Sequence, residues 1–194
     1  MENVSEFLVG RTDQYGDAAE GPMGIVSVPS GRLRIVDAFG NAEGGGCVLL
    51  VPPGEHRAWV TLVSLDQTSW QPAYLSVAFS AEPPATVAFA DYLVAPPIPS
   101  SGAVTGTDTA TIAVYDDAAG IDLAALQARL AVELDAPAPM PTGYANVTLG
   151  STRIAACHTG RDGAFPILAT ATSAGHLTAV HIDFYLVDFD PGDD

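Results

Sequence analysis

The stretch Phe165–Phe184, FPILATATSAGHLTAVHIDF, contains the clearest β-hairpin pattern in the chain. Two runs rich in strand-forming residues flank Ala174-Gly175, which we interpret as a two-residue turn. Such a turn fixes the register, because it gives each residue a single cross-strand partner. One face of the hairpin is then wholly apolar and pairs Phe165 with Phe184, Ile167 with Ile182 and Ala169 with Val180. The opposite face pairs Leu168 with His181 and Pro166 with Asp183.

Similar short runs, separated by Gly, Pro, Asp and Asn, occur along most of the chain and predict a mainly β fold. We expect a single antiparallel β-sandwich or bent-sheet domain of about nine or ten strands with one short amphipathic helix. We expect Pro29-Ser30-Gly31 to join two hairpin strands, and the proline-rich stretch 95–106 to be a loop. The strand Arg153–His158 should extend the closing hairpin into a three-stranded meander, with His158 opposite Ala164. The predicted strands are 23–28, 32–37, 47–51, 56–65, 73–80, 86–91, 109–115, 153–158, 165–172 and 177–186.

One segment has the spacing of a helix instead. The leucines Leu123, Leu126, Leu130 and Leu134 recur at helical intervals on alanine-rich sequence. Asp122 stands where an N-cap residue would accept hydrogen bonds from the first turn. The spacing predicts a helix over 122–134 whose leucine stripe packs on a sheet, and the prolines of 136–143 end it.

The chain has 194 residues, of which 48% are hydrophobic, enough for one core of ordinary domain size. We divide it into an acidic N-terminal extension (1–21), a single β-rich domain (22–187) and an acidic C-terminal tail (188–194). The extension lacks the basic and apolar regions of a signal peptide, so we expect a cytoplasmic protein. Cys47 and Cys157 are then expected to be reduced and buried, although the sequence leaves a disulfide between them open.

The net charge of the chain limits the classes of molecule that it is expected to bind. The chain has 23 acidic and 7 basic residues, a formal net charge of −16, and contains no lysine. Without lysine it can build neither a Schiff base nor a Walker-type phosphate loop. A field this negative repels nucleic acid and anionic membranes, so we expect no binding to either. A basic protein partner would be attracted; the alternative is that the charge serves solubility alone.

Several turn motifs together resemble a known family. In order, these are Gly31–Asp37, Pro52-Pro53-Gly54, the segment Tyr115–Gly120, and the closing pattern from Cys157 through Gly160-Arg161-Asp162-Gly163 to Asp183-Phe184. The chain resembles, over roughly residues 24–187, the uncharacterised bacterial domain of unknown function 4241 family. Arg161 departs from that pattern, which has glycine there. The resemblance implies a single domain and carries no activity.

The candidate site combines the loop 158–163 with the strand 181–183. Asp162, His181 and Asp183 offer oxygen and nitrogen ligands for a divalent cation, with His158 and Arg161 as further pocket residues. The competing interpretation makes Asp162-Gly163 a plain turn and His181 a hydrogen-bonded structural residue. We predict no cofactor, and a divalent cation is the alternative left open.

Two classes of function follow. The leading hypothesis is a non-enzymatic binding or protein-interaction module, in one version an acidic antagonist of a basic partner. The alternatives are a divalent-metal-dependent hydrolase using Asp162, His181 and Asp183, or a carbohydrate-binding module that exposes a row of aromatic side chains. The aromatic residues considered for that row are Trp59, Trp70, Tyr74, Tyr92 and Tyr115.

Overall fold

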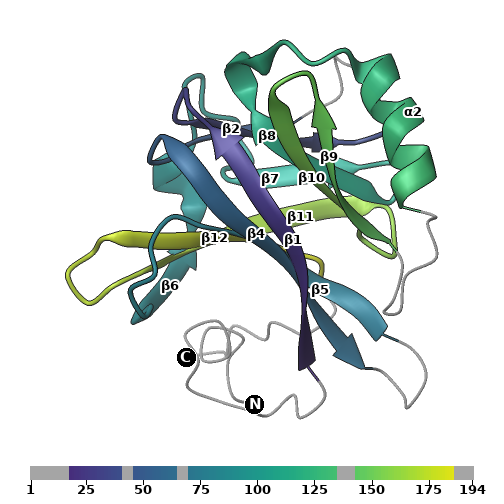
Figure 1. Ribbon diagram of the computed structural model, residues 1–194. Helices are drawn as coiled ribbons and strands as arrows, with labels where there is room; N and C mark the ends of the chain where they lie inside the picture. The colour runs from purple at the N-terminus through teal and green to yellow at the C-terminus, as the bar shows by residue number, and fades with distance from the viewer. Residues whose placement is uncertain (1–17, 41–45, 65–69, 135–142, 186–194) are drawn as a thin grey trace.

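The computed structural model describes residues 18–40, 46–64, 70–134 and 143–185. These residues form two antiparallel β-sheets that pack on each other, with one α-helix against the outer face of the smaller sheet (Figure 1). The fold is therefore mainly β and of the sandwich type, as the strand pattern predicts.

The larger sheet has the strand order β1-β4-β5-β12-β11-β6, and β7 pairs with the first part of β11. Its strands are β1 (Ala18–Val28), β4 (Gly54–Ser64), β5 (Trp70–Ala78), β6 (Thr86–Phe89), β7 (Val104–Thr107), β11 (Gly163–Ala171) and β12 (Leu177–Asp183). The smaller sheet has the order β3-β2-β8-β10-β9. Its strands are β2 (Arg32–Asp37), β3 (Cys47–Leu50), β8 (Thr111–Asp116), β9 (Tyr144–Leu149) and β10 (Thr152–His158).

The main core fills the space between the sheets. Alternate residues of each strand point inward, as the two-residue repeat of a strand requires. The larger sheet contributes Val60, Leu75 and Ile182, and the smaller sheet contributes Leu33 and Val114; all five are at most 2% exposed. The fold therefore depends on contacts between residues that are far apart in the chain.

A second, smaller core lies beneath the helix α2 (Leu123–Glu133), on the outer face of the smaller sheet. Leu126 and Leu130 are fully buried there against β8 and β10 residues, and Leu134 is 2% exposed. The carboxylate of Asp122 accepts the backbone N–H groups of Ala124 and Ala125, at 3.0 and 3.3 Å. The predicted helix, its N-cap and its buried stripe are thus confirmed.

The closing hairpin has the predicted register along most of β11 and β12, but the predicted two-residue turn at Ala174-Gly175 is wrong. The N–H of Gly175 donates to the carbonyl of Thr172 at 2.9 Å, so the chain reverses over Thr172–Gly175, one residue earlier than predicted. Ile167 pairs with Ile182, Leu168 with His181 and Ala169 with Val180, and a register shift follows only at Thr170/Ala171, near the turn. The aromatic rings of Phe165 and Phe184 meet edge to face, with centroids 5.4 Å apart. This hairpin occupies the middle of the larger sheet, between β5 and β6.

The hairpin predicted around Pro29-Ser30-Gly31 is wrong. The chain does turn there, and the N–H of Gly31 donates to the carbonyl of Val28 at 3.1 Å. However, β1 pairs with β4, whereas β2 pairs with β3 and β8 in the other sheet. A turn signal is local, so it predicts that the chain reverses but not which strands then pair.

The same reason explains the error in the three-stranded meander. β10 lies in the smaller sheet and β11 in the larger one, so His158 pairs with Thr111, and Ala164 pairs with Gly106. The stretch expected to be a loop contains β7, whose Thr105 and Thr107 are buried despite the nearby prolines. With β7 and β9 included, the described residues contain twelve strands rather than nine or ten.

The predicted domain boundaries are only partly covered by the described residues. β1 begins at Ala18, so the strand includes residues 18–21 that we assigned to the N-terminal extension. The rest of that extension and the tail 188–194 lie outside the described residues. Within the described ranges, no helix has the length and apolar character needed to cross a membrane; α2 itself has 11 residues.

Candidate functional site

His181, one of the three predicted metal ligands, lies in a buried chain of hydroxyl groups. Its side chain is on β12, and the residue is 4% exposed. Its Nδ1 is 2.8 Å from Ser76 Oγ and its Nε2 is 3.2 Å from Thr170 Oγ1, to which Thr178 Oγ1 donates at 2.8 Å. Burial lowers the pKa of His181 to about 4, because the charged ring would lose its hydration. Both ring nitrogens are thus occupied by hydroxyl groups, which suits a neutral structural histidine.

Asp183 lies two residues further along the same face of β12, as predicted, and is 2% exposed. Its Oδ1 accepts the N–H of Tyr185 at 2.8 Å. Burial raises the pKa of Asp183 to about 6, although that hydrogen bond and the charge of Arg161 act in the opposite direction. The buried carboxyl group therefore helps to fix the backbone where β12 ends.

Arg161 reaches the same strand end from the loop between β10 and β11. Its Nη2 donates to the carbonyl of Phe184 at 3.1 Å, and its guanidinium group lies 5.5 Å from the ring centroid of Tyr185. The structure therefore brings Arg161 and Asp183 to one place, where the loop is fastened to the end of β12.

The other two candidates lie apart from this place or make no contact with it. Asp162 is exposed and forms no hydrogen bond or ion pair in the described part of the chain. His158 belongs to the smaller sheet, where its Nδ1 is 2.9 Å from Thr111 Oγ1. Among the described residues, no three or more His, Cys, Asp or Glu side chains are grouped so that they could hold a metal ion.

The aromatic residues proposed for a sugar-binding row are differently exposed. Tyr74 is fully buried and Tyr115 is 6% exposed, whereas Tyr92 is 64% exposed. The ring of Trp59 packs edge-on against His181, with centroids 6.1 Å apart. Most of these rings thus serve packing, which gives the carbohydrate-binding alternative little support.

Cys47 and Cys157 are both free thiols in the main core, each at most 1% exposed. Burial raises the pKa of Cys47 to about 11 and that of Cys157 further still, and a nearby Asp91 adds to the effect at Cys47. Both thiols therefore stay protonated and unreactive at neutral pH.

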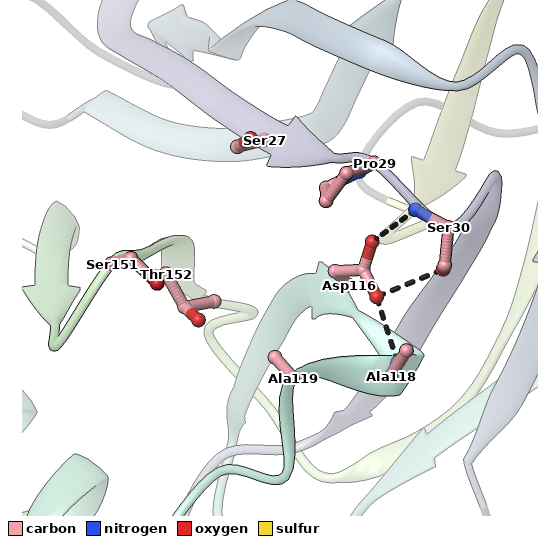
Figure 2. A pocket seen from close by; sticks show the side chains of 8 residues that line it. All are labelled: Ser27, Pro29, Ser30, Asp116, Ala118, Ala119, Ser151 and Thr152. Carbon is pink, nitrogen blue, oxygen red and sulfur yellow. Dashed lines mark hydrogen bonds between the residues drawn. The ribbon is translucent and has the colours of Figure 1, made fainter.

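A cavity that the sequence analysis missed lies where the chain crosses between the sheets. We call it the crossover cavity; it has a volume of about 200 Å³. Three separate segments line it: the end of β1 with its turn, the 3-10 helix η2 (Asp117–Ala119) with the residue before it, and the β9–β10 turn (Figure 2). The lining residues are Ser27, Pro29, Ser30, Asp116, Ala118, Ala119, Ser151 and Thr152.

Asp116 is the charged residue of the crossover cavity and is 3% exposed. Its Oδ2 accepts the backbone N–H of Ser30 at 2.8 Å. Its Oδ1 accepts the hydroxyl of Ser30 at 2.8 Å and the N–H of Ala118 at 2.7 Å. Figure 2 shows the carboxyl group turned toward Ser30 and Ala118, with Ser151 and Thr152 across the cavity. Asp116, at the end of β8 in the smaller sheet, thus fixes the turn that leads from β1 in the larger sheet to β2.

The neighbouring carboxylate, that of Asp117, forms ion pairs with two arginine side chains. Arg32 Nη2 is 2.9 Å and Arg34 Nε is 2.5 Å from its oxygens. Partial burial would raise the pKa of Asp117, but the hydrogen bonds and charges of Arg34 and Arg32 outweigh it and hold the pKa below its usual range. Asp117 is therefore an internal ion-pair partner, whereas the hydrogen bonds to Asp116 come from neutral groups.

Local sequence signals existed for two of the three lining segments of the cavity, but none showed that these segments would come together. The turn at Pro29-Ser30-Gly31 and the segment Tyr115–Gly120 were both recognised as turns. Ser30 and Asp116 are 86 residues apart, and only the pairing of β2 with β8 brings them together.

Comparison with protein-family models, with curated proteins and with solved structures finds no match for this chain. The resemblance to the domain of unknown function 4241 family therefore stays a prediction.

Proposed function

We propose that the protein is a non-enzymatic binding module whose acidic surface binds a basic protein partner. One observation carries this proposal: every arginine in the described ranges is already engaged within the chain. Five are in ion pairs: Arg32 and Arg34 with Asp117, Arg57 with Glu20, Arg129 with Glu133, and Arg153 with Glu55. The sixth, Arg161, donates to backbone carbonyls.

The acidic residues greatly outnumber these arginines. The chain has 23 acidic residues and 7 basic ones. Among the described residues, Glu82, Asp108 and Asp162 are exposed and have no ion-pair partner. Charges of one sign on a surface accelerate and strengthen association with a partner of opposite charge. The surplus carboxylates thus favour a lysine- or arginine-rich protein surface over nucleic acid or an anionic lipid.

We place this binding in the cytoplasm. The two core thiols are free, which is consistent with a reducing compartment. The divalent-metal-dependent hydrolase remains the alternative, but no arrangement of the described side chains favours it over the binding module.

Binding to a defined basic probe tests the proposal. The probe is a fluorescent peptide of alternating Lys, Arg and Gly, and its matched control carries Gln at each basic position. We expect the full chain to bind the basic peptide in an anisotropy titration, with an affinity that falls as NaCl is raised from about 0.05 to about 0.5 M. Equal affinity for the neutral peptide, or no binding of the basic peptide at the lowest salt, would overturn the proposal.

A further inference from the structure

We infer that the crossover cavity binds one cationic side chain of the basic partner, a lysine ammonium or an arginine guanidinium group. This inference rests on the proposed function and adds to it a specific site. It is carried by the charge, the lining and the size of the cavity.

The first reason is the uncompensated charge of Asp116. Its hydrogen-bond donors, Ser30 and Ala118, are neutral, and no arginine in the described ranges forms an ion pair with it. The adjacent Arg32 and Arg34 are both held by Asp117. A carboxylate has about four acceptor positions, and three are used, so one remains for a charged donor. A cationic donor at that position would add a charge-assisted hydrogen bond, which is stronger than the bonds from the neutral donors.

The second reason is the hydroxyl lining. The side chains of Ser27, Ser151 and Thr152 form no hydrogen bond within the described part of the chain, and all three line the cavity. An ammonium group has three N–H donors and a guanidinium group has five. A cationic head group in the cavity would have Asp116 on one side and the hydroxyl groups of Ser151 and Thr152 on the other, so the lining offers acceptors on both sides.

The third reason is size. The cavity volume of about 200 Å³ equals that of about seven water molecules at about 30 Å³ each. Pockets for drug-sized ligands begin at about 300 Å³. The crossover cavity is therefore suited to a single side chain inserted from a protein surface.

Titration of the labelled full chain with small cations tests the site. The probes are Nα-acetyl-lysinamide and Nα-acetyl-argininamide, with uncharged Nα-acetyl-norleucinamide and glucose as controls. We expect saturable amide shifts at Ser30, Ala118 and Thr152 in the nitrogen-15 spectrum with the cationic probes only. Equal shifts with glucose would identify a polyol site, and shifts that spread without saturation would identify unspecific attraction; either result overturns the inference.

Three variants localise the effect. Asp116→Asn removes the charge. Ser151→Phe fills the cavity from an exposed turn position, and the Ser151 side chain has no hydrogen bond to lose among the described residues. Asp162→Asn is the matched control, because it removes the same charge from an exposed residue that has no partner among the described residues. We expect at least a tenfold loss of probe affinity in the first two variants and less than a twofold change in the third. If Asp116→Asn fails to fold, Ser151→Phe alone tests the site. Unchanged affinity of Ser151→Phe for the cationic probes would show that the cavity is not the binding site.

The same variants separate this inference from the proposed function. If the wild-type chain binds the basic peptide and Ser151→Phe binds it equally well, the cavity assignment fails and the binding module stands. If the wild-type chain does not bind the basic peptide, the proposed function itself fails.

Discussion

His181 makes the folded state sensitive to acid. Its pKa is about 4 in the folded chain and near 6.5 when exposed, because burial removes the hydration that the charged ring needs. Between these pH values the unfolded chain binds the additional proton. The stability that the neutral ring contributes is therefore fully present above about pH 6.5 and is lost as the pH falls to about 4. We expect this loss to be about 3 kcal/mol in the free energy of unfolding.

Asp183 acts in the opposite direction, so the measurement must separate the two residues. Its raised pKa of about 6 means that its contribution grows as the pH falls through that value. Urea unfolding of the wild-type chain and of His181→Asn, at several pH values between about 7 and about 4.5, isolates the histidine. We expect the wild-type stability to fall more steeply than that of the variant, and the fall to steepen further in Asp183→Asn. Parallel curves for wild type and His181→Asn would contradict the assignment.

At the level of elements, α2 depends on its cap and on its buried stripe. Asp122 satisfies two N–H groups of the first turn, and the residue itself is exposed. We expect Asp122→Ala to lower the free energy of unfolding by about 1 kcal/mol, whereas Asp122→Asn, which keeps an acceptor, should stay within a few tenths of wild type. Urea unfolding of the three proteins measures this, and an alanine variant as stable as wild type would show that the cap contributes nothing.

The elements also show how far the sequence could predict this fold. The strand pairing of the closing hairpin and the helix α2 were predicted correctly because each is specified by residues close together in the chain: alternating apolar positions, or leucines at helical spacing. The turn of that hairpin was placed one residue too late. β7 was missed because its Gly and Pro neighbours outweighed a short buried strand whose partner, β11, lies about sixty residues further on.

At the scale of the whole molecule, the turns that lead from one sheet to the other were the features that local patterns could not predict. The turns after β1 and β10 look like hairpin turns, yet each of them carries the chain into the other sheet. The crossover cavity arises from one of these transitions, so Asp116 could not be recognised as a site residue. The residues singled out instead, His181 and Asp183, were placed correctly on one face of β12, but their burial depends on the complete larger sheet.

The net charge of −16 makes the stability of the whole molecule depend on salt. Surplus carboxylates repel one another in the compact state, and added ions screen that repulsion. The exposed ion pairs, such as Arg57–Glu20, are each worth about 1 kcal/mol or less, so weakening them costs little by comparison. We therefore expect the melting temperature at neutral pH to rise by several degrees as NaCl is raised from about 0.05 to about 0.5 M.

The control is the same salt series near pH 4.2, the isoelectric point of the sequence, where net repulsion vanishes. A rise at neutral pH that disappears there identifies charge repulsion as the cause, because the general effect of salt on apolar burial persists at both pH values. An equal rise at both would show that the surplus carboxylates do not oppose folding. In that case the acidic residues lie far enough apart that their repulsion does not lower the free energy of unfolding. The binding of a basic partner would then gain less free energy from neutralising them.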